Sequence, residues 1–269
     1  MTDKEYRQAE GLAQSTLKLL RDKTPAHALH AMQNKKEPSE AMLIGSAVHA
    51  IVLENRIGHV VLPDAAKGSS KLAKALRADF EAEHSDKIVL SQASADKVML
   101  MAESVLSHKG ASALLSIDGQ SELPIFWEET IIMPDGERVV KMKGKLDRSN
   151  PLGVIDLKKT CESSMRRLSI AIESYGYHIQ AAHYLAGAAA NGLPADDFIF
   201  IFVEDEAPHL THLKKLDHES IFEGELARQE LIKKYLKCVD NNYWPGYNDS
   251  IETISIPRYG FRHSIYEEN

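Results

Sequence analysis

The chain has 269 residues and a mass of 30.0 kDa, with 43% apolar and 26% charged residues. This composition is that of an ordinary globular protein and excludes a disordered chain, a collagen-like repeat and a coiled-coil fibre. The apolar runs are far shorter than the roughly 18 residues of a membrane span, and the polar first residues lack a signal-peptide pattern. We therefore expect a soluble protein that contacts no membrane. Two cysteines, Cys161 and Cys238, are too few for a disulfide framework or a four-thiolate metal centre, so we expect free thiols.

Positive charge is concentrated in one part of an otherwise acidic chain. The formal net charge is −7, but residues 138–167 hold nine basic and three acidic side chains, a formal +6 against −13 for the rest. On charge alone, this segment fits either a solvated hairpin face or a surface that captures a polyanion.

The first part of the chain is predicted to be helical. Apolar periodicity predicts helices over residues 11–21, 41–53, 71–84 and 91–108, separated by polar loops at 35–39 and 63–70. Thr24-Pro25 marks a break or a new helix start, and Ser70 and Ser91 are the expected N-caps of the two later helices.

From residue 121 the pattern changes to that of a sheet with covering helices. Residues 121–133 and 138–146, rich in β-branched and alternating residues, flank the turn Pro134-Asp135-Gly136-Glu137 and predict a β-hairpin. A second turn at 149–153 leads into a short apolar strand at 154–157. The remaining segments are predicted as helices at 163–173, 177–191 and 218–239, strands at 198–203 and 210–216, and an irregular tail from Tyr243.

This order of elements predicts an α/β fold with a mixed central β-sheet flanked by helices and a helical N-terminal region. We expect one domain over residues 1–269: a mainly helical part at 1–110, a core at 111–240 that carries the chemistry, and an irregular tail at 241–269.

The most informative pattern is formed by Asp147, Asp156 and Lys158. Asp156 and Lys158 are separated by one residue on a predicted strand, so both side chains leave the same face. With Asp147 on the adjacent strand, two carboxylates can bind one or two divalent cations. Such a cation polarises a phosphodiester and lowers the pKa of a bound water, while Lys158 can orient that water or neutralise developing charge. The alternative is an ordinary ion pair at a strand end.

With these residues the chain resembles the PD-(D/E)XK nuclease superfamily. Gln180 and Tyr184 match the Gln-x-x-x-Tyr pattern of its RecB-like branch and share one helix face, where they could contact a phosphate or a base. Gly45 and His49 match the Gly-x-x-x-His pattern of the same branch, in which the histidine lies beside the metal. The resemblance implies metal ligation by Asp147, Asp156 and His49, and a catalytic set of Asp147, Asp156, Lys158, Gln180, Tyr184, His49 and Glu122.

Glu122 enters this set because RecB-like nucleases often carry an acid on the strand before the Gly-x-x-Asp strand. Glu128 and Glu129 compete with it on the same segment, and we favour Glu122. His178 and His183 flank Gln180, and we expect them to be packing or surface residues.

A narrower resemblance is to RecE-type exonucleases (the exonuclease VIII nuclease domain). It is carried by Ser15-Thr16-Leu17, Thr24-Pro25-Ala26-His27, Gly45–Glu54 and Trp244-Pro245-Gly246-Tyr247 with a tail that contains Pro257. It implies a Mg²⁺-dependent 5′→3′ exonuclease, with Mn²⁺ as a substitute, that degrades linear double-stranded DNA in the cytoplasm of a bacterium or phage-infected cell. It also implies a single-strand annealing partner of the RecT type, in recombination.

The resemblance also gives the basic segment at residues 138–167 an expected role in binding DNA. Lys143, Lys145, Arg148 and Lys159 lie close in sequence to the predicted metal site and are expected to line a DNA path. Because an exonuclease must hold a DNA end, we also expect a homo-oligomeric ring with this segment facing inward.

Three alternatives stay open. The site chemistry is shared with RecB-like endonucleases and single-strand nucleases, which no motif here separates. A catalytically inactive PD-(D/E)XK-like module that only binds DNA or proteins would be expected to lack an acid or the lysine, and this chain keeps Asp147, Asp156 and Lys158. The third alternative is an ordinary α/β protein in which these motifs occur by chance.

Overall fold

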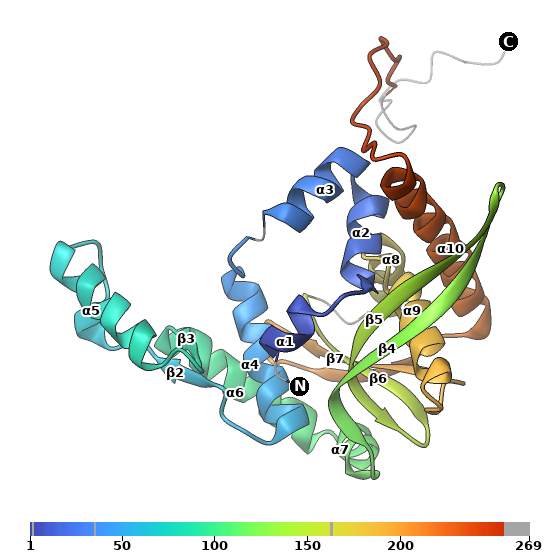
Figure 1. The fold of residues 1–269 in the computed structure, drawn as a ribbon. Coiled ribbons are helices and arrows are strands. Elements are labelled where there is room, and N and C mark those ends of the chain that lie inside the picture. Colours follow the sequence, from blue (N-terminus) through green and yellow to red (C-terminus); the bar gives the residue numbers. More distant parts are fainter. Residues whose placement is uncertain (2, 35, 162–163, 256–269) are drawn as a thin grey trace, which may run out of the picture.

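The structure is a computed structural model that describes residues 1, 3–34, 36–161 and 164–255 (Figure 1). A six-stranded mixed sheet forms its centre, and helices cover both faces. The elements, in chain order, are α1 (Asp3–Gln8), β1 (Leu12–Ala13), α2 (Gln14–Asp22), α3 (Pro25–Gln33), α4 (Glu40–Glu54), β2 (His59–Val61), η1 (Asp64–Ala66), α5 (Lys71–Glu83), β3 (Ile88–Leu90), α6 (Gln92–Ser107), α7 (Lys109–Ser116), β4 (Gln120–Met133), β5 (Gly136–Asn150), β6 (Gly153–Thr160), α8 (Met165–Ser174), α9 (Tyr177–Ala190), β7 (Phe198–Glu204), β8 (Thr211–Lys215) and α10 (His218–Asp240).

Strand β5 organises the sheet. Strand β4 pairs antiparallel along one edge of β5, from Gln120↔Ser149 to Met133↔Gly136. The other edge of β5 is shared: β1 pairs with it in parallel at Met142 and Lys143, and β6 pairs antiparallel at residues 148–150. Between those two contacts, on this edge of β5, the described part of the chain places no strand beside residues 144–147. We call this interruption the notch.

Two apolar layers sandwich the strands beyond the notch. On one face, Phe198, Phe200 and Phe202 of β7 pack with residues of α2, α8, α9 and α10. On the other face, Ile201 and Val203 pack with residues of α4, α6 and α7. Alternating side chains of one strand therefore enter two cores, which explains why β7 is an almost continuous apolar run.

Residues 59–90 form an arm that projects from this body (Figure 1). Its base is the parallel pair β2 and β3, and α5 lies beyond it with Ala73 as its one buried residue. Among the described residues, no helix has both the length and the apolar character needed to cross a bilayer.

Most of the expected elements are confirmed, as are the fold class and the N-caps Ser70 and Ser91. Thr24 caps a new helix. The helix expected at 11–21 is wrong at its start, because Leu12 and Ala13 instead pair with the open edge of β5. The sequence pattern missed β2, β3 and α7, which are too short for a clear periodicity. The division at residue 110 stays a prediction, and Pro257 lies outside the described residues.

The crossing of α9 and α10 generates a stability prediction. A Cβ at Gly224 would lie 2.2 Å from the backbone oxygen of His178, so Gly224→Ala must push the helices apart. Although alanine favours a helix by about 1 kcal/mol, we expect a net loss of about 1–3 kcal/mol in the free energy of unfolding, measured in urea. Gly45→Ala is the matched control, because nothing described lies within 4 Å of its Cβ, and it should gain up to about 1 kcal/mol. Equal stability of the two variants would contradict this packing.

Candidate active site

The site lies at the notch, where β4, β5 and β6 meet α4. Glu122 of β4 falls opposite Asp147 of β5, between the paired residues Ser121↔Arg148 and Leu123↔Leu146. Glu122 has a φ of 51°, in the left-handed region that non-glycine residues rarely adopt. Such local strain persists when the surroundings hold it, and it is frequent at functional sites.

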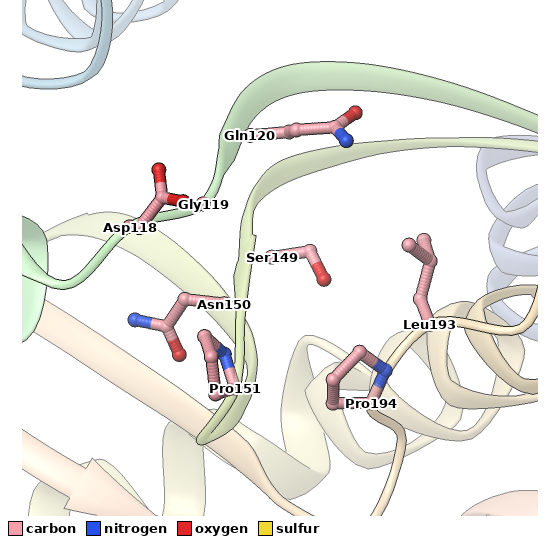
Figure 2. A pocket seen from close by; sticks show the side chains of 8 residues that line it. All are labelled: Asp118, Gly119, Gln120, Ser149, Asn150, Pro151, Leu193 and Pro194. Carbon is pink, nitrogen blue, oxygen red and sulfur yellow. The ribbon is translucent and has the colours of Figure 1, made fainter.

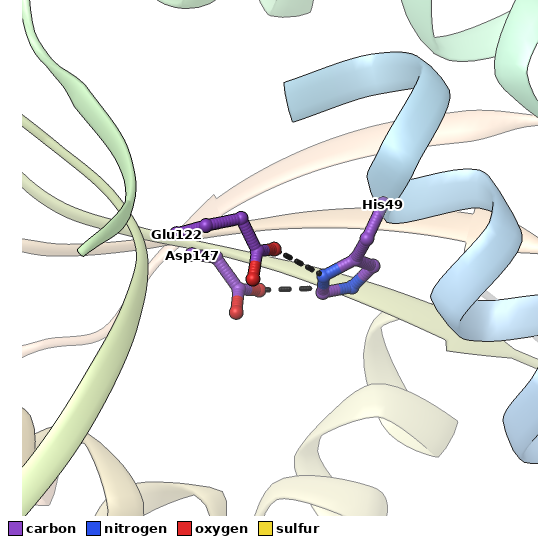
Figure 3. A group of neighbouring side chains, drawn as sticks. All are labelled: His49, Glu122 and Asp147. Carbon is purple, nitrogen blue, oxygen red and sulfur yellow. Dashed lines mark hydrogen bonds and ion pairs between the residues drawn. The ribbon is translucent and has the colours of Figure 1, made fainter. Parts of the chain in front are cut away.

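His49 reaches both acids from α4 (Figure 3). Its Nδ1 lies 3.4 Å from Glu122 Oε1, and its Nε2 lies 3.7 Å from Asp147 Oδ2 and 3.0 Å from the carbonyl oxygen of Leu157. Lys145 completes the group, because its Nζ lies 2.5 Å from Glu122 Oε2. The described ligand atoms of His49, Glu122 and Asp147 all lie within 4.8 Å of one another.

Asp147 also shapes the backbone beside it. The β5–β6 ladder stops at Arg148↔Ile155, and the Leu157 N–H donates to Asp147 Oδ2 at 2.8 Å instead of to a strand. His49 Nε2 forms a hydrogen bond with the Leu157 carbonyl oxygen. The backbone groups left without a ladder are thus satisfied by side chains of the site, as buried peptide groups require.

Asp156 and Lys158 form a buried ion pair next to this cluster. Asp156 is 1% exposed, and its Oδ2 lies 2.5 Å from Lys158 Nζ. That oxygen has no well-aligned hydrogen bond within the described chain, whereas Oδ1 accepts one from Gln180 Nε2 at 2.9 Å. The Lys158 ammonium also lies 5.4 Å from the ring centre of Tyr177. The expectation that both side chains leave one face of β6 is confirmed.

Tyr184 lies one turn after Gln180 on α9 and contacts its side chain. Its ring lies over Gly144, where a Cβ would be 3.3 Å from two ring carbons. The glycine of the Gly-x-x-Asp pattern therefore makes room for the tyrosine of the Gln-x-x-x-Tyr pattern. The sequence contains both patterns, but the contact between Gly144 and Tyr184 follows only from the packing of α9 on β5.

The charges of the site depend strongly on one another. Burial disfavours the charged form of His49, but the charge of Asp147 and the hydrogen bond and charge of Glu122 outweigh it and raise the pKa of His49 to about 9. Burial raises the pKa of Asp156 to about 6, against the opposing charge of Lys158. Glu122 is also desolvated, yet hydrogen bonds from His49 and Lys145 lower its pKa. At neutral pH the three carboxylates face three cationic groups, His49, Lys145 and Lys158, so a divalent cation would bind by displacing the imidazole proton.

A cleft of about 990 Å³ opens onto this group. Its walls include His49, Glu122 and Lys145 at the site, Tyr6 and Arg7 of α1, and Gly58, Asp86 and Ile88 at the base of the arm. The cleft therefore connects the candidate active site with the arm, and α1 forms part of its wall.

Known proteins share the sequence family and the fold of this chain. The family described as a PDDEXK-like domain of unknown function (DUF3799) matches residues 13–257. The chain belongs to this family. A crystal structure of a Eubacterium rectale protein, provisionally named an exonuclease, covers 96% of this chain and 96% of its own at 15% identity and a TM-score of 0.66, which shows a shared fold. The structure of SSO0001 covers 71% of this chain and 84% of its own at 15% identity, and its TM-score of 0.30 is too low to carry an argument. No curated protein matches the chain.

Membership in the PDDEXK-like family confirms the sequence-based resemblance at the level of superfamily and fold. The narrower RecE-type resemblance stays a prediction. The resemblance implied Asp147, Asp156 and His49 as metal ligands. In the structure the convergent ligand atoms are those of His49, Glu122 and Asp147, while Asp156 contacts Lys158 and Gln180 in an adjoining group. The roles of these residues stay predictions.

The donor set fits a divalent cation. Two carboxylates and one imidazole converge, and a buried oxygen of Asp156 next to them lacks an aligned partner. Oxygen-rich sites of this kind suit hard cations such as Mg²⁺ or Mn²⁺. Of the three acids weighed on β4, Glu128 is exposed and Glu129 binds Arg228, so Glu122 alone reaches the cluster.

The four cations expected on the DNA path all have partners within the chain. Lys143 donates to the backbone oxygens of Tyr6 and Ala9, and so fastens α1 to the sheet. Arg148 donates to the hydroxyl of Ser121 and to the Ile117 oxygen. Lys145 pairs with Glu122, as described above, and Lys159 pairs with Asp205. A DNA-contact role for them stays a prediction.

His183 is fully buried and its Nε2 bonds the Lys143 carbonyl oxygen, so it packs within the core as expected. His178 is partly buried and bonds the Ile172 oxygen. Neither histidine belongs to the candidate metal-binding cluster of His49, Glu122 and Asp147.

A second pocket of about 270 Å³ is lined by none of the candidate site residues (Figure 2). Asp118 is its one charged lining residue, and the remainder are small, amide or apolar residues. It therefore offers neither a metal-binding set nor a nucleophile with a base.

The cluster predicts metal-dependent stabilisation. With Mn²⁺ at about 100 times its Kd, occupancy of the folded state should add about 2.7 kcal/mol of stability and raise the Tm. Glu122→Gln and Asp147→Asn should lose this increase, because each removes a charged ligand. Glu128→Gln, an exposed acid of the same strand, should keep it. Thermal unfolding with and without Mn²⁺ makes the measurement, and an unchanged increase in both site variants would refute the ligand assignment.

Proposed function

We propose that this protein is a metal-dependent deoxyribonuclease that hydrolyses phosphodiester bonds at the notch. The observation that carries the proposal is the convergence of the metal-binding cluster (His49, Glu122 and Asp147) with the buried Asp156–Lys158 pair. A bound divalent cation would polarise the scissile phosphodiester and supply an activated water.

The chain's own residues have separable tasks in this proposal. Lys158 is a partly buried ammonium, with 19% of its side chain exposed, and the carboxylates of Asp156 and Asp147 raise its pKa against the effect of burial. It is suited to stabilise the negative charge that develops on the phosphorus oxygens. Gln180 fixes the orientation of Asp156 through its hydrogen bond. His49, Glu122 and Asp147 supply candidate metal ligands from three elements, α4, β4 and β5.

The finer assignment is a Mg²⁺-dependent 5′→3′ exonuclease acting on linear double-stranded DNA for recombination by single-strand annealing. It is supported by the RecE-type motif resemblance and by the fold shared with the Eubacterium rectale protein. A RecT-type annealing protein is the proposed partner. A homo-oligomeric ring is the proposed means of holding a DNA end.

Loss of the buried pair should abolish turnover. Lys158→Gln is expected to lower kcat on the order of 10²-fold or more with little change in DNA affinity, because the charge matters most in the transition state. Asp156→Asn should be at least as severe. Lys215→Gln, which breaks an exposed ion pair with Asp197, is the control and should retain activity. Release of acid-soluble nucleotides from linear duplex in Mg²⁺ measures kcat, and a loss confined to KM would make Lys158 a phosphate contact instead.

Exonuclease action makes a separate prediction. Linear duplex should be degraded from its ends, while covalently closed circles of the same sequence survive prolonged incubation. Light scattering should give a mass several times 30.0 kDa. Rapid nicking of the circles would favour the RecB-like endonuclease and leave the site chemistry intact. A strictly monomeric active enzyme would exclude the ring.

A further inference from the structure

The arm carries three cations that have no partner among the described residues. Lys71, Lys74 and Arg77 of α5 are exposed, and within the described part of the chain their side chains make no ion pair or hydrogen bond. They contrast with the four cations beside the notch, each of which has a partner in the chain.

The three side chains form one basic stripe. They follow one another at intervals of three residues, so they lie on neighbouring positions of the helix surface, and the rise of the helix spreads them over about 9 Å. Ala75 lies between Lys74 and Arg77, and Ala78 follows Arg77. These small side chains allow a sugar–phosphate backbone to approach closely.

The charge order of α5 does not serve the helix itself. Its cations occupy the N-terminal half, and its acids, Asp79, Glu81 and Glu83, occupy the C-terminal half. The helix macrodipole favours the reverse arrangement, with acids first and cations last. Helix stability therefore does not explain the stripe, whereas a polyanionic ligand does.

The position of the stripe relates it to the candidate active site. The cleft that contains His49 and Glu122 extends to Gly58, Asp86 and Ile88 at the base of the arm: Gly58 precedes β2, Asp86 precedes β3, and Ile88 begins β3. Beyond that base, α5 projects away from the body (Figure 1). A nucleic acid whose end occupies the cleft would extend past the arm on leaving it.

We propose that the arm is a second DNA-contact surface, on which Lys71, Lys74 and Arg77 bind backbone phosphates of the duplex outside the cleft. This inference rests on the proposed function, because it takes DNA as the substrate. The contacts are electrostatic and independent of sequence. They add affinity and hold the substrate near the cleft without taking part in the chemistry.

The test compares two triple variants in the Asp156→Asn background, which prevents turnover. The arm variant carries Lys71→Gln, Lys74→Gln and Arg77→Gln. The control carries Lys23→Gln, Lys36→Gln and Lys109→Gln, which are also exposed cations without a partner in the described chain. Fluorescence anisotropy with an end-labelled linear duplex gives the binding constant over a series of salt concentrations.

Three lost phosphate contacts should reduce the slope of log K against log salt by about 2.7 in the arm variant and leave it unchanged in the control. The Tm of the arm variant should not fall, because the replaced charges oppose the helix dipole. An unchanged slope, or an equal reduction in both variants, overturns the proposal.

Two further outcomes distinguish DNA binding by the arm from protein docking on the same helix, and from the proposed nuclease activity. Leu72 and Leu76 are 71% and 38% exposed on the same helix. If Leu72→Ser with Leu76→Ser abolishes self-association while the arm variant binds DNA like the parent, α5 docks protein and the proposal fails. If the wild-type protein binds duplex with the steep salt slope but does not cleave it in Mg²⁺, the proposed nuclease activity fails and the arm contact stands.

Discussion

The separation of β5 from β6 at Asp147 is the constraint on which the site depends. A continuing antiparallel ladder would use the N–H and carbonyl of Leu157 and would leave no room for metal ligands between the strands. Asp147 and His49 instead take these two groups as hydrogen-bond partners. The same side chains thus satisfy the backbone and belong to the candidate metal cluster, so the opening in the sheet and this cluster are one structural feature.

Buried charge at this position is costly to the fold. Removing an ion pair such as Asp156–Lys158 from water costs several kcal/mol per ion, and replacing a buried pair by well-packed apolar residues is often neutral or stabilising. Core packing therefore gives no reason for this pair. The carboxylate of Asp147 lies near the pair, and its charge raises the pKa of Asp156 further. A cation bound by the cluster would offset that repulsion, which agrees with a charge arrangement kept for chemistry.

The two helical layers approach the notch from opposite faces and supply different groups. Helix α4 contributes His49, and its apolar residues pack in the layer with α6 and α7. Helix α9 contributes Gln180 and Tyr184, and packs in the other layer. The close approach of α9 requires Gly144 beneath Tyr184 and Gly187 against Trp127, where a Cβ would lie 2.6 Å from the indole ring. The position of the site residues is consequently set by the cores that hold their helices.

The sequence by itself determined the order of the main elements, the mixed sheet and the superfamily, because apolar periodicity, turn residues and the Asp156-Leu157-Lys158 string are local. The resemblance to the RecB-like branch added Gln180 and His49 as candidate site residues, and their roles stay predictions. Only the tertiary structure decided that Glu122, rather than Glu128 or Glu129, meets His49, and that the cations beside the notch are paired. It alone placed Leu12 on an open strand edge and α5 on a projecting arm. These features depend on contacts between residues distant in the chain, which leave no periodic pattern in the sequence.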